Sequence, residues 1–330
     1  MCKFGIRDGV WRVRWHRRYR RFFFIMAQYL LNILGRAGSD PLRVLSIQDS
    51  RMNTPPSESK LLIFTDLDGS LLDHHDYRFE PAAALLQKLN FLNIPVIPAT
   101  SKTEAELLHL RSTLANEHPF IAENGAAVFI PKGYFPEPPE GTTETGDFRI
   151  KEFTEPREHW LSLIARTGAD RADYKTFSEA TVTDIIELTG LEQDAAVRAS
   201  RRHYGEPLAW LGGDGRREQF VFELRQLGAN VMQGGRFLHV SGNCDKGKAL
   251  KWLVDQYKNV FLEPILTVAV GDGQNDIAML EAADMAVLIP SPAHDLPVLN
   301  KSQRVYVASS QGPQGWAESI TMILERLPIQ

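Results

Sequence analysis

The sequence predicts an α/β protein built on a doubly wound, Rossmann-like parallel sheet, with a second domain inserted into it. Apolar runs that do not alternate with polar residues occupy 61–64, 94–99 and 266–270, and such runs are typical of strands covered on both faces. Stretches with helical periodicity at 79–92 and 249–257 supply the crossovers that parallel strands need. The chain has 330 residues, of which 43% are hydrophobic and 24% charged, so it has room for two ordinary globular domains.

The strand expected at 61–64 leads into two carboxylates and a glycine. Asp66 and Asp68 lie two residues apart, so their side chains project the same way from an extended backbone. Carboxylates held that close repel each other unless one is protonated or a cation lies between them. Gly69 then lets the chain turn sharply. This pattern predicts a metal ion held beside a nucleophile.

A second acidic cluster follows the apolar run at 266–270. Gly271 and Asp272 come directly after the run, and Asp276 follows four residues later. In an open α/β sheet the ligand crevice lies beyond the carboxyl ends of the strands. We therefore expect both acidic clusters at the same edge of the sheet.

Hydroxyl groups follow the strand expected at 94–99. Thr100 and Ser101 come just before a helix predicted at 104–114, where hydroxyls and free backbone N–H groups form an anion site. Thr100 taken alone has an alternative role as a helix cap. Lys102, in the same turn, is expected to be a solvated or capping group.

A lysine precedes the helical stretch at 249–257. Lys246 and Lys248 both lie in this position, and a lysine there can reach a phosphate oxygen as a compact cation. The two residues compete for this one role.

The remaining elements are short and divide the chain into domains. We predict strands at 120–122, 287–289 and 305–307 and a closing helix at 314–327. A break rich in proline and glycine at 136–141 opens an insertion that has no strand ending in acids. The predicted parts are a disordered or non-native extension at 1–56, a core at 57–140 and 237–330, and a cap of strands and helices at 141–236.

Four motifs in this order carry a family resemblance. Asp-x-Asp-Gly-Ser, a hydroxyl at the second strand end, a lysine before a helix, and Gly-Asp-x-x-Asn-Asp resemble the motifs of haloacid dehalogenase-type phosphatases. Ser70 stands where that family usually has threonine, and it keeps the hydroxyl. The stretches 119–135 and 235–249 also resemble the mannosyl-3-phosphoglycerate phosphatase subfamily, and the resemblance covers about 60–327. It implies a haloacid dehalogenase-like core with an inserted α+β cap.

The resemblance also implies a role for each acid. Asp66 would be the nucleophile and a metal ligand, and Asp68 the general acid/base, whose backbone carbonyl also binds the ion. Asp272 would be the third protein ligand, while Asp276 would hold a metal-bound water or Lys246. The register of the family motif favours Lys246 over Lys248 as the lysine that contacts the phosphate. A phosphomonoester and the paired acids are both dianionic, and an oxygen-only ligand set favours Mg²⁺ as the cation between them.

Substrate contacts are expected at two strand ends. Thr100 and Ser101 would contact the phosphate. Glu123, Asn124 and Gly125 follow the third strand and would contact the leaving group, although Asn124 and Gly125 also fit a simple tight turn.

The expected activity is hydrolysis of mannosyl-3-phosphoglycerate to mannosylglycerate, a compatible solute. The alternatives are phosphatases for glucosyl-3-phosphoglycerate or sucrose 6-phosphate, a phosphotransferase or mutase, and a non-catalytic regulator that binds sugar phosphates. A regulator would gain nothing from a nucleophile and a general acid.

The first 51 residues differ in charge from the rest. They carry 11 basic and 3 acidic residues, a net charge of +8, so the remaining chain carries −12 and is not expected to bind nucleic acid. The apolar stretch 22–34 is too short to span a bilayer, so no stable membrane insertion is expected. Three interpretations stay open, which are translation from Met52, a basic membrane-surface segment, and a secretory signal. We expect a cytoplasmic enzyme, because its sugar phosphate is found there, and the sequence leaves the oligomeric state open.

Overall fold

The computed structural model of this chain describes residues 4–7, 10–13, 59–234 and 237–327. They fall into two units divided after Arg43, and each is considered by itself. In the first unit, β1 (Phe4–Arg7) and β2 (Val10–Val13) form an antiparallel hairpin. The apolar stretch 22–34 and Met52, and with them the three interpretations of the extension, lie outside the described residues.

The core of the second unit is a parallel sheet with the strand order β15-β14-β13-β3-β4. Its strands, in chain order, are β3 (Lys60–Thr65), β4 (Val96–Pro98), β13 (Ile265–Gly271), β14 (Met285–Leu288) and β15 (Val305–Val307). The predicted parallel α/β core is therefore confirmed. β3 and β13 lie side by side at its centre, which brings the two acid-bearing strand ends together.

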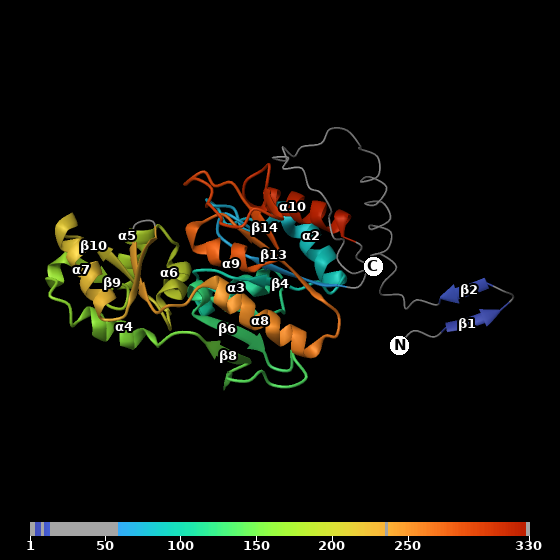
Figure 1. The fold of residues 1–330 in the computed structure, drawn as a ribbon, viewed down its shortest axis with the longest axis horizontal. Coiled ribbons are helices and arrows are strands. Elements are labelled where there is room, and N and C mark those ends of the chain that lie inside the picture. The colour runs from blue at the N-terminus through green and yellow to red at the C-terminus, as the bar shows by residue number, and fades with distance from the viewer. Residues whose placement is uncertain (1–3, 8–9, 14–58, 235–236, 328–330) are drawn as a thin grey trace. The chain divides into compact units, whose positions relative to one another are not determined.

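Helices cover both faces of this sheet (Figure 1). They are α2 (Glu80–Phe91), α3 (Glu104–Thr113), α8 (Lys246–Val260), α9 (Ile277–Ala282) and α10 (Gly312–Arg326). Leu61 and Ile63 pack into the apolar cluster that contains α2 and α10, whereas Leu62 and Phe64 pack into the cluster that contains α8 and α9. This double coverage is the reason that the strand reads as a continuous apolar run.

A second sheet continues beside β4. It has the antiparallel order β5-β6-β8-β7 and consists of β5 (Phe120–Ala122), β6 (Ala127–Pro131), β7 (Thr143–Thr145) and β8 (Phe148–Glu152). A single parallel bridge between Ala99 and Ile121 joins β5 to the end of β4. The third strand end therefore lies next to the second.

The insertion forms its own antiparallel sheet, with the order β11-β12-β10-β9. Its strands are β9 (Tyr174–Thr176), β10 (Glu206–Trp210), β11 (Asn230–Gly234) and β12 (Phe237–Ser241), and its helices are α4 (Arg157–Ile164), α5 (Val182–Thr189), α6 (Gln193–Ser200) and α7 (Asp214–Gln226). Trp160, Leu208 and Phe220 belong to an apolar cluster confined to this part. Such an independent core is what a separate domain requires.

Strand pairing changes the limits that we assign to the cap. Residues 148–152 pair with β6 of the core-side sheet and residues 143–145 pair with them in turn, whereas residues 237–241 pair with strands of the insertion. Both segments thus lie on the other side of the boundaries expected near 141 and 236. We propose that the cap runs from about residue 154 to about residue 242.

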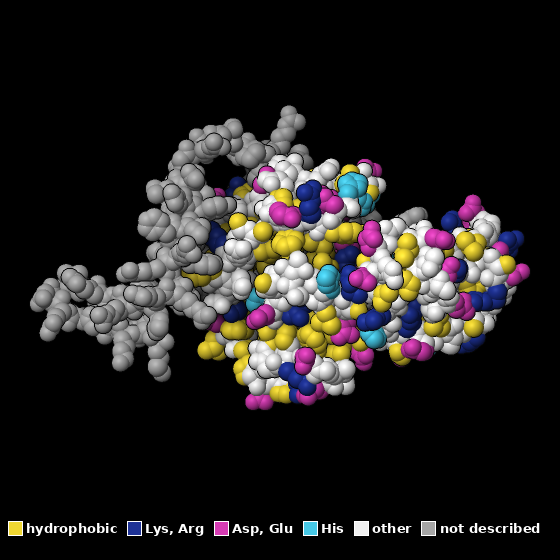
Figure 2. All heavy atoms as spheres, turned by 180° about the vertical axis from the view of Figure 1, so that it is seen from behind, with side chains coloured by type: hydrophobic (Ala, Val, Ile, Leu, Met, Phe, Trp, Pro, Cys, Tyr) yellow, Lys and Arg dark blue, Asp and Glu magenta, His cyan; other side chains and the backbone are white. Residues whose placement is uncertain are grey.

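The surface mixes charges of both signs. On the face of the described residues shown in Figure 2, Lys and Arg side chains lie among Asp and Glu side chains over both the core and the cap. Among those residues, no helix combines the length and the apolar character needed to cross a bilayer.

Glu123 links the cap to the core. Its buried carboxylate accepts hydrogen bonds from the backbone N–H groups of His203 at 2.7 Å and Gly205 at 2.9 Å. The Arg202 guanidinium lies 3.2 Å from the same carboxylate and also donates to the carbonyl of Ser101 at 3.1 Å. A single buried charge thus holds the turn at 202–205 against two strand ends.

We predict that Glu123→Gln lowers the free energy of unfolding by about 2–3 kcal/mol. One amide N–H₂ would replace an accepting oxygen and face the donors that the carboxylate now satisfies. The midpoint of urea denaturation measures the change, and Glu117→Gln, at an exposed position, is the matched control. Equal midpoints for the two variants would show that the Glu123 contacts do not stabilise the fold.

Candidate active site

Lys246 lies between two acids that come from different strand ends. Asp66 directly follows β3, and its backbone N–H donates to the carbonyl of Val270 in β13 at 2.8 Å. Lys246 is the first residue of α8, and its Nζ lies 2.6 Å from Asp66 Oδ1 and 2.6 Å from Asp276 Oδ1. All three side chains are buried. Residues 30 to 210 positions apart in the chain thus form one charged cluster.

Asp276 organises the loop after β13. It ends a short 3₁₀ turn, η4 (Gln274–Asp276), and its Oδ2 accepts the backbone N–H groups of Asp272 at 3.1 Å and Gly273 at 3.0 Å. With Lys246 on the other oxygen, both oxygens of this carboxylate are occupied by protein groups. Asp276 therefore fixes Lys246 and the loop that carries Asp272.

Three carboxylates converge in this cluster. Oxygen atoms of Asp66, Asp272 and Asp276 all lie within 4.8 Å of one another. Burial raises the pKa of Asp66 well above its usual value, Lys246 opposes the rise, and the neighbouring acids add to it. Burial and Asp276 also raise the pKa of Asp272, although His294 Nε2 lies 3.4 Å from its Oδ2. One lysine does not neutralise three buried acids, so the cluster suits a hard cation with oxygen ligands.

Gly69 is required by space as well as by the turn. Its φ of +80° lies in the left-handed region that glycine adopts readily. A Cβ at this position would lie 2.6 Å from Asp272 Oδ2. The two acidic loops therefore approach each other over a position where only glycine fits.

Asp68 is not one of the three clustered acids, and it pairs with a different lysine. Its Oδ2 lies 2.9 Å from Lys102 Nζ, while its Oδ1 is buried and has no hydrogen-bond partner among the described residues. The Lys102 side chain is only 13% exposed, so the expectation that it is solvated or capping was wrong. Its position two residues after Thr100 could have indicated that it lies near the acids, because the ends of the parallel strands meet at one edge of the sheet.

Lys248 does not share the position of Lys246. Its Nζ donates to the backbone carbonyl of Asn243 at 2.7 Å, and the side chain is 46% exposed. Of the two candidate lysines, the structure places only Lys246 among the acids.

Thr100 and Ser101 occupy the end of β4. Thr100 is buried, and its Oγ1 accepts the backbone N–H of Lys102 at 3.2 Å. The N-cap residue of helix α3 is instead Thr103, whose side chain forms a reciprocal capping box with that of Glu106. The hydroxyl of Thr100 is therefore not used as a helix cap.

The residues after β5 hold parts of the site together. Both oxygens of the Glu123 carboxylate contact the turn at 202–205 of the cap domain. They are therefore engaged by the protein and do not face a substrate. Asn124 Oδ1 accepts from Asn275 Nδ2 at 3.1 Å, which ties the third strand end to the loop after β13. A Cβ on Gly125 would lie 2.2 Å from the carbonyl of Asp245, so this glycine allows α8 to approach closely.

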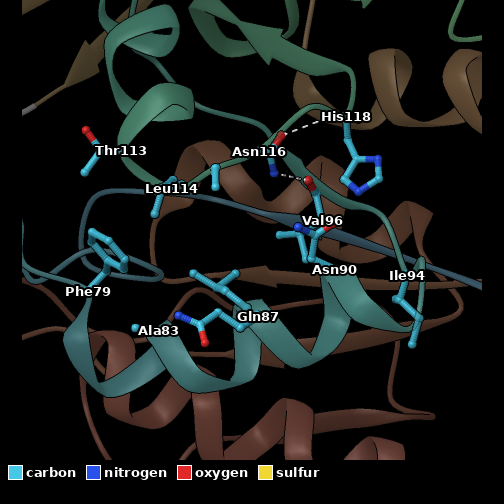
Figure 3. Close-up of a pocket in the computed structure, with 12 residues that line it drawn as sticks. Phe79, Ala83, Gln87, Asn90, Ile94, Val96, Thr113, Leu114, Asn116 and His118 are labelled. Atoms are coloured by element: carbon cyan, nitrogen blue, oxygen red, sulfur yellow. Dashed lines mark hydrogen bonds between the residues drawn. The ribbon is translucent and has the colours of Figure 1, made fainter. Parts of the chain in front are cut away.

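A separate cavity of about 280 Å³ lies between α2 and the end of α3 (Figure 3). Its walls include Phe79, Gln87 and Leu114, and Asn116 closes one side by donating to the carbonyl of Val96 at 2.8 Å. None of the acidic residues of the cluster lines it. The cavity is therefore not the reaction site.

Comparison with known proteins agrees with the motif order. A family model described as haloacid dehalogenase-like hydrolase matches residues 63–135 and 225–294. A glucosyl-3-phosphoglycerate/mannosyl-3-phosphoglycerate phosphatase of Methanococcoides burtonii is 34% identical over 265 residues, which are 79% of this chain and 96% of that protein.

Solved structures share the fold at low sequence identity. A protein from Thermotoga maritima has a TM-score of 0.56 at 19% identity, with 82% of this chain and 98% of that chain covered. The sucrose-phosphatase of Synechocystis sp. PCC6803 has a TM-score of 0.52 at 16% identity, with 80% and 98% covered. With its motifs, its fold and its relative in agreement, the chain belongs to the haloacid dehalogenase-like hydrolase family.

Proposed function

We propose that this protein is a Mg²⁺-dependent phosphatase of sugar phosphoglycerates that acts through an aspartyl-phosphate on Asp66. The observation that carries the proposal is the convergence of Asp66, Asp272 and Asp276 in one buried cluster, in which Lys246 bonds Asp66 and Asp276. Family membership and a phosphatase relative make the protein a phosphoric monoester hydrolase.

The substrate class rests on the relative from Methanococcoides burtonii. Its name covers both glucosyl-3-phosphoglycerate and mannosyl-3-phosphoglycerate, so we propose these two esters as substrates of this chain. The product from the mannosyl ester would be mannosylglycerate.

The donor set fits a divalent cation. Asp66, Asp272 and the backbone carbonyl of Asp68 would hold Mg²⁺, because these oxygens are the ligands that this hard ion prefers. When bound, the ion would neutralise the acids and the phosphate dianion and orient the phosphorus for attack. Asp276 would act indirectly, since both of its oxygens are engaged by Lys246 and the loop amides.

The residues divide the reaction into two steps. In the first, Asp66 attacks phosphorus, an aspartyl-phosphate forms, and Asp68 gives its proton to the leaving alkoxide. In the second, Asp68 takes a proton from water, which attacks phosphorus and frees both inorganic phosphate and Asp66. Lys246 and the Thr100 hydroxyl would stabilise charge on the transferring oxygens throughout.

A panel of phosphate esters tests the function. We expect the purified protein to release phosphate from both sugar phosphoglycerates with a higher kcat/KM than from sucrose 6-phosphate. EDTA should abolish the release, and excess Mg²⁺ should restore it. Turnover of a different ester alone would reject the substrate class, and full turnover in EDTA would reject the metal dependence.

Asp66→Asn should lower kcat by at least about 10⁴-fold, because an amide oxygen is a poor nucleophile towards phosphorus. Asp255→Asn is the matched control, since Asp255 is an exposed acid whose carboxylate pairs with Lys258 at 3.1 Å. Phosphate release under saturating substrate measures both variants. Retention of the wild-type rate by Asp66→Asn would remove the aspartyl-phosphate from the mechanism.

Metal binding can be measured without turnover. At a Mg²⁺ concentration about 100 times Kd, the free energy of unfolding should rise by about 2.7 kcal/mol, because the ion binds only the folded acid cluster. Asp272→Asn should lose this gain and, without Mg²⁺, should be at least as stable as the wild type, because it removes a buried repelling charge. Thermal melts with and without Mg²⁺ give both quantities, and an equal Mg²⁺ shift in the two proteins would place the ion elsewhere.

A further inference from the structure

Three groups surround the ammonium group of Lys102. Its Nζ lies 2.9 Å from Asp68 Oδ2 and 4.0 Å from Glu106 Oε1. The same nitrogen lies 4.9 Å from the centroid of the Tyr77 ring, within the range of a cation–π contact. Such an arrangement leaves the ammonium group little freedom.

The backbone around Lys102 is also fixed. Its N–H donates to Thr100 Oγ1 at 3.2 Å, and its carbonyl accepts the N–H of Glu123 at 3.0 Å. Glu106, in turn, has its Oε2 bonded to the N–H and the hydroxyl of Thr103 at 2.8 and 2.9 Å. The carboxylate that steadies Lys102 is therefore itself locked by the start of α3.

Tyr77 adds a constraint from the opposite loop. Its φ of 58° lies in the left-handed region, which a bulky residue adopts only when its surroundings hold it there. Tyr77 is 43% exposed, so its ring contacts Lys102 at the surface of the protein and not within the core. The loop after β3 thus contributes both Asp68, which pairs with Lys102, and Tyr77, whose ring contacts the same lysine.

The two oxygens of Asp68 are in different states. Oδ2 is paired with Lys102, whereas Oδ1 is buried and free of partners among the described residues. A general acid/base needs one oxygen free for the proton and a fixed orientation of the carboxyl group. A charge-assisted hydrogen bond to the other oxygen supplies that orientation.

We propose that Lys102 is a positioning residue that holds Asp68 through Oδ2 and leaves Oδ1 to carry the proton. This inference rests on the proposed phosphatase function. Lys102 acts through Asp68 and does not contact the transferring phosphate. Without it, the carboxylate would rotate and solvate, and the proton transfers in both steps would slow down.

Lys102→Met tests the assignment by removing the charge while keeping an unbranched side chain. We expect kcat on the preferred sugar phosphate to fall about 10²-fold, with KM changed less than about 3-fold, because binding groups stay in place. Lys102→Arg should recover most of the rate by restoring a donor. Lys132→Met is the matched control, since Lys132 pairs with Glu144 at a similar 2.8 Å on the surface.

A second substrate separates positioning from general damage. p-Nitrophenolate leaves without protonation, so formation of the aspartyl-phosphate needs no acid, whereas its hydrolysis still needs the base. Lys102→Met should therefore give a burst of about one p-nitrophenolate per active site, followed by a slow steady rate. Damage to the whole site would slow the burst and the steady rate equally.

The outcomes distinguish the two proposals. If the wild type hydrolyses the panel and Lys102→Met keeps its kcat, or loses both phases equally, the positioning role is wrong while the phosphatase function stands. A wild type that hydrolyses no ester would overturn the proposed function and this inference with it. Should thermal melts show that Lys102→Met is unfolded, Lys102→Gln is subjected to the same two assays, and the same results decide.

Discussion

Charge balance in a buried space is the constraint on which the rest of the site depends. Lys246 is fully buried and bridges Asp66 and Asp276, and Asp272 lies in the same cluster. Buried charges are tolerated only when they are paired and hydrogen-bonded. Lys246 is one cation among three acids, and the remaining negative charge is what makes the cluster suitable for a hard divalent cation.

The sheet makes this concentration of charge possible. Because β3 and β13 are hydrogen-bonded neighbours, their acidic loops begin at the same height. The lack of a side chain at Gly69 leaves space for Asp272, and Asp276 holds the second loop by accepting two of its backbone N–H groups. The apolar core fixes the positions of the strands. Its packing therefore offsets the repulsion between the acids in the two loops.

Much of this arrangement could be predicted from sequence, because strand-end chemistry follows from local patterns. Apolar runs located the strands, and acids directly after them located the edge where Asp66 and Asp272 meet. The pairing of Lys102 with Asp68 was missed, because its place two residues after Thr100 indicates the edge of the sheet but not which acid from another strand end lies beside it. Glu123 was expected to contact a substrate, but its carboxylate contacts the Arg202 guanidinium and the backbone N–H groups of His203 and Gly205, which are distant in the chain and which no local pattern encodes.

The turn after β5 has a consequence for how the two domains communicate. Glu123 accepts a hydrogen bond from the cap at His203. The next residue, Asn124, accepts one from Asn275 in the loop after β13. The attachment of the cap and the position of the loop after β13 therefore both depend on one short 3₁₀ segment, η2 (Glu123–Gly125). A change in the contacts of the turn at 202–205 therefore has a short route through the backbone to the loop that carries Asp272.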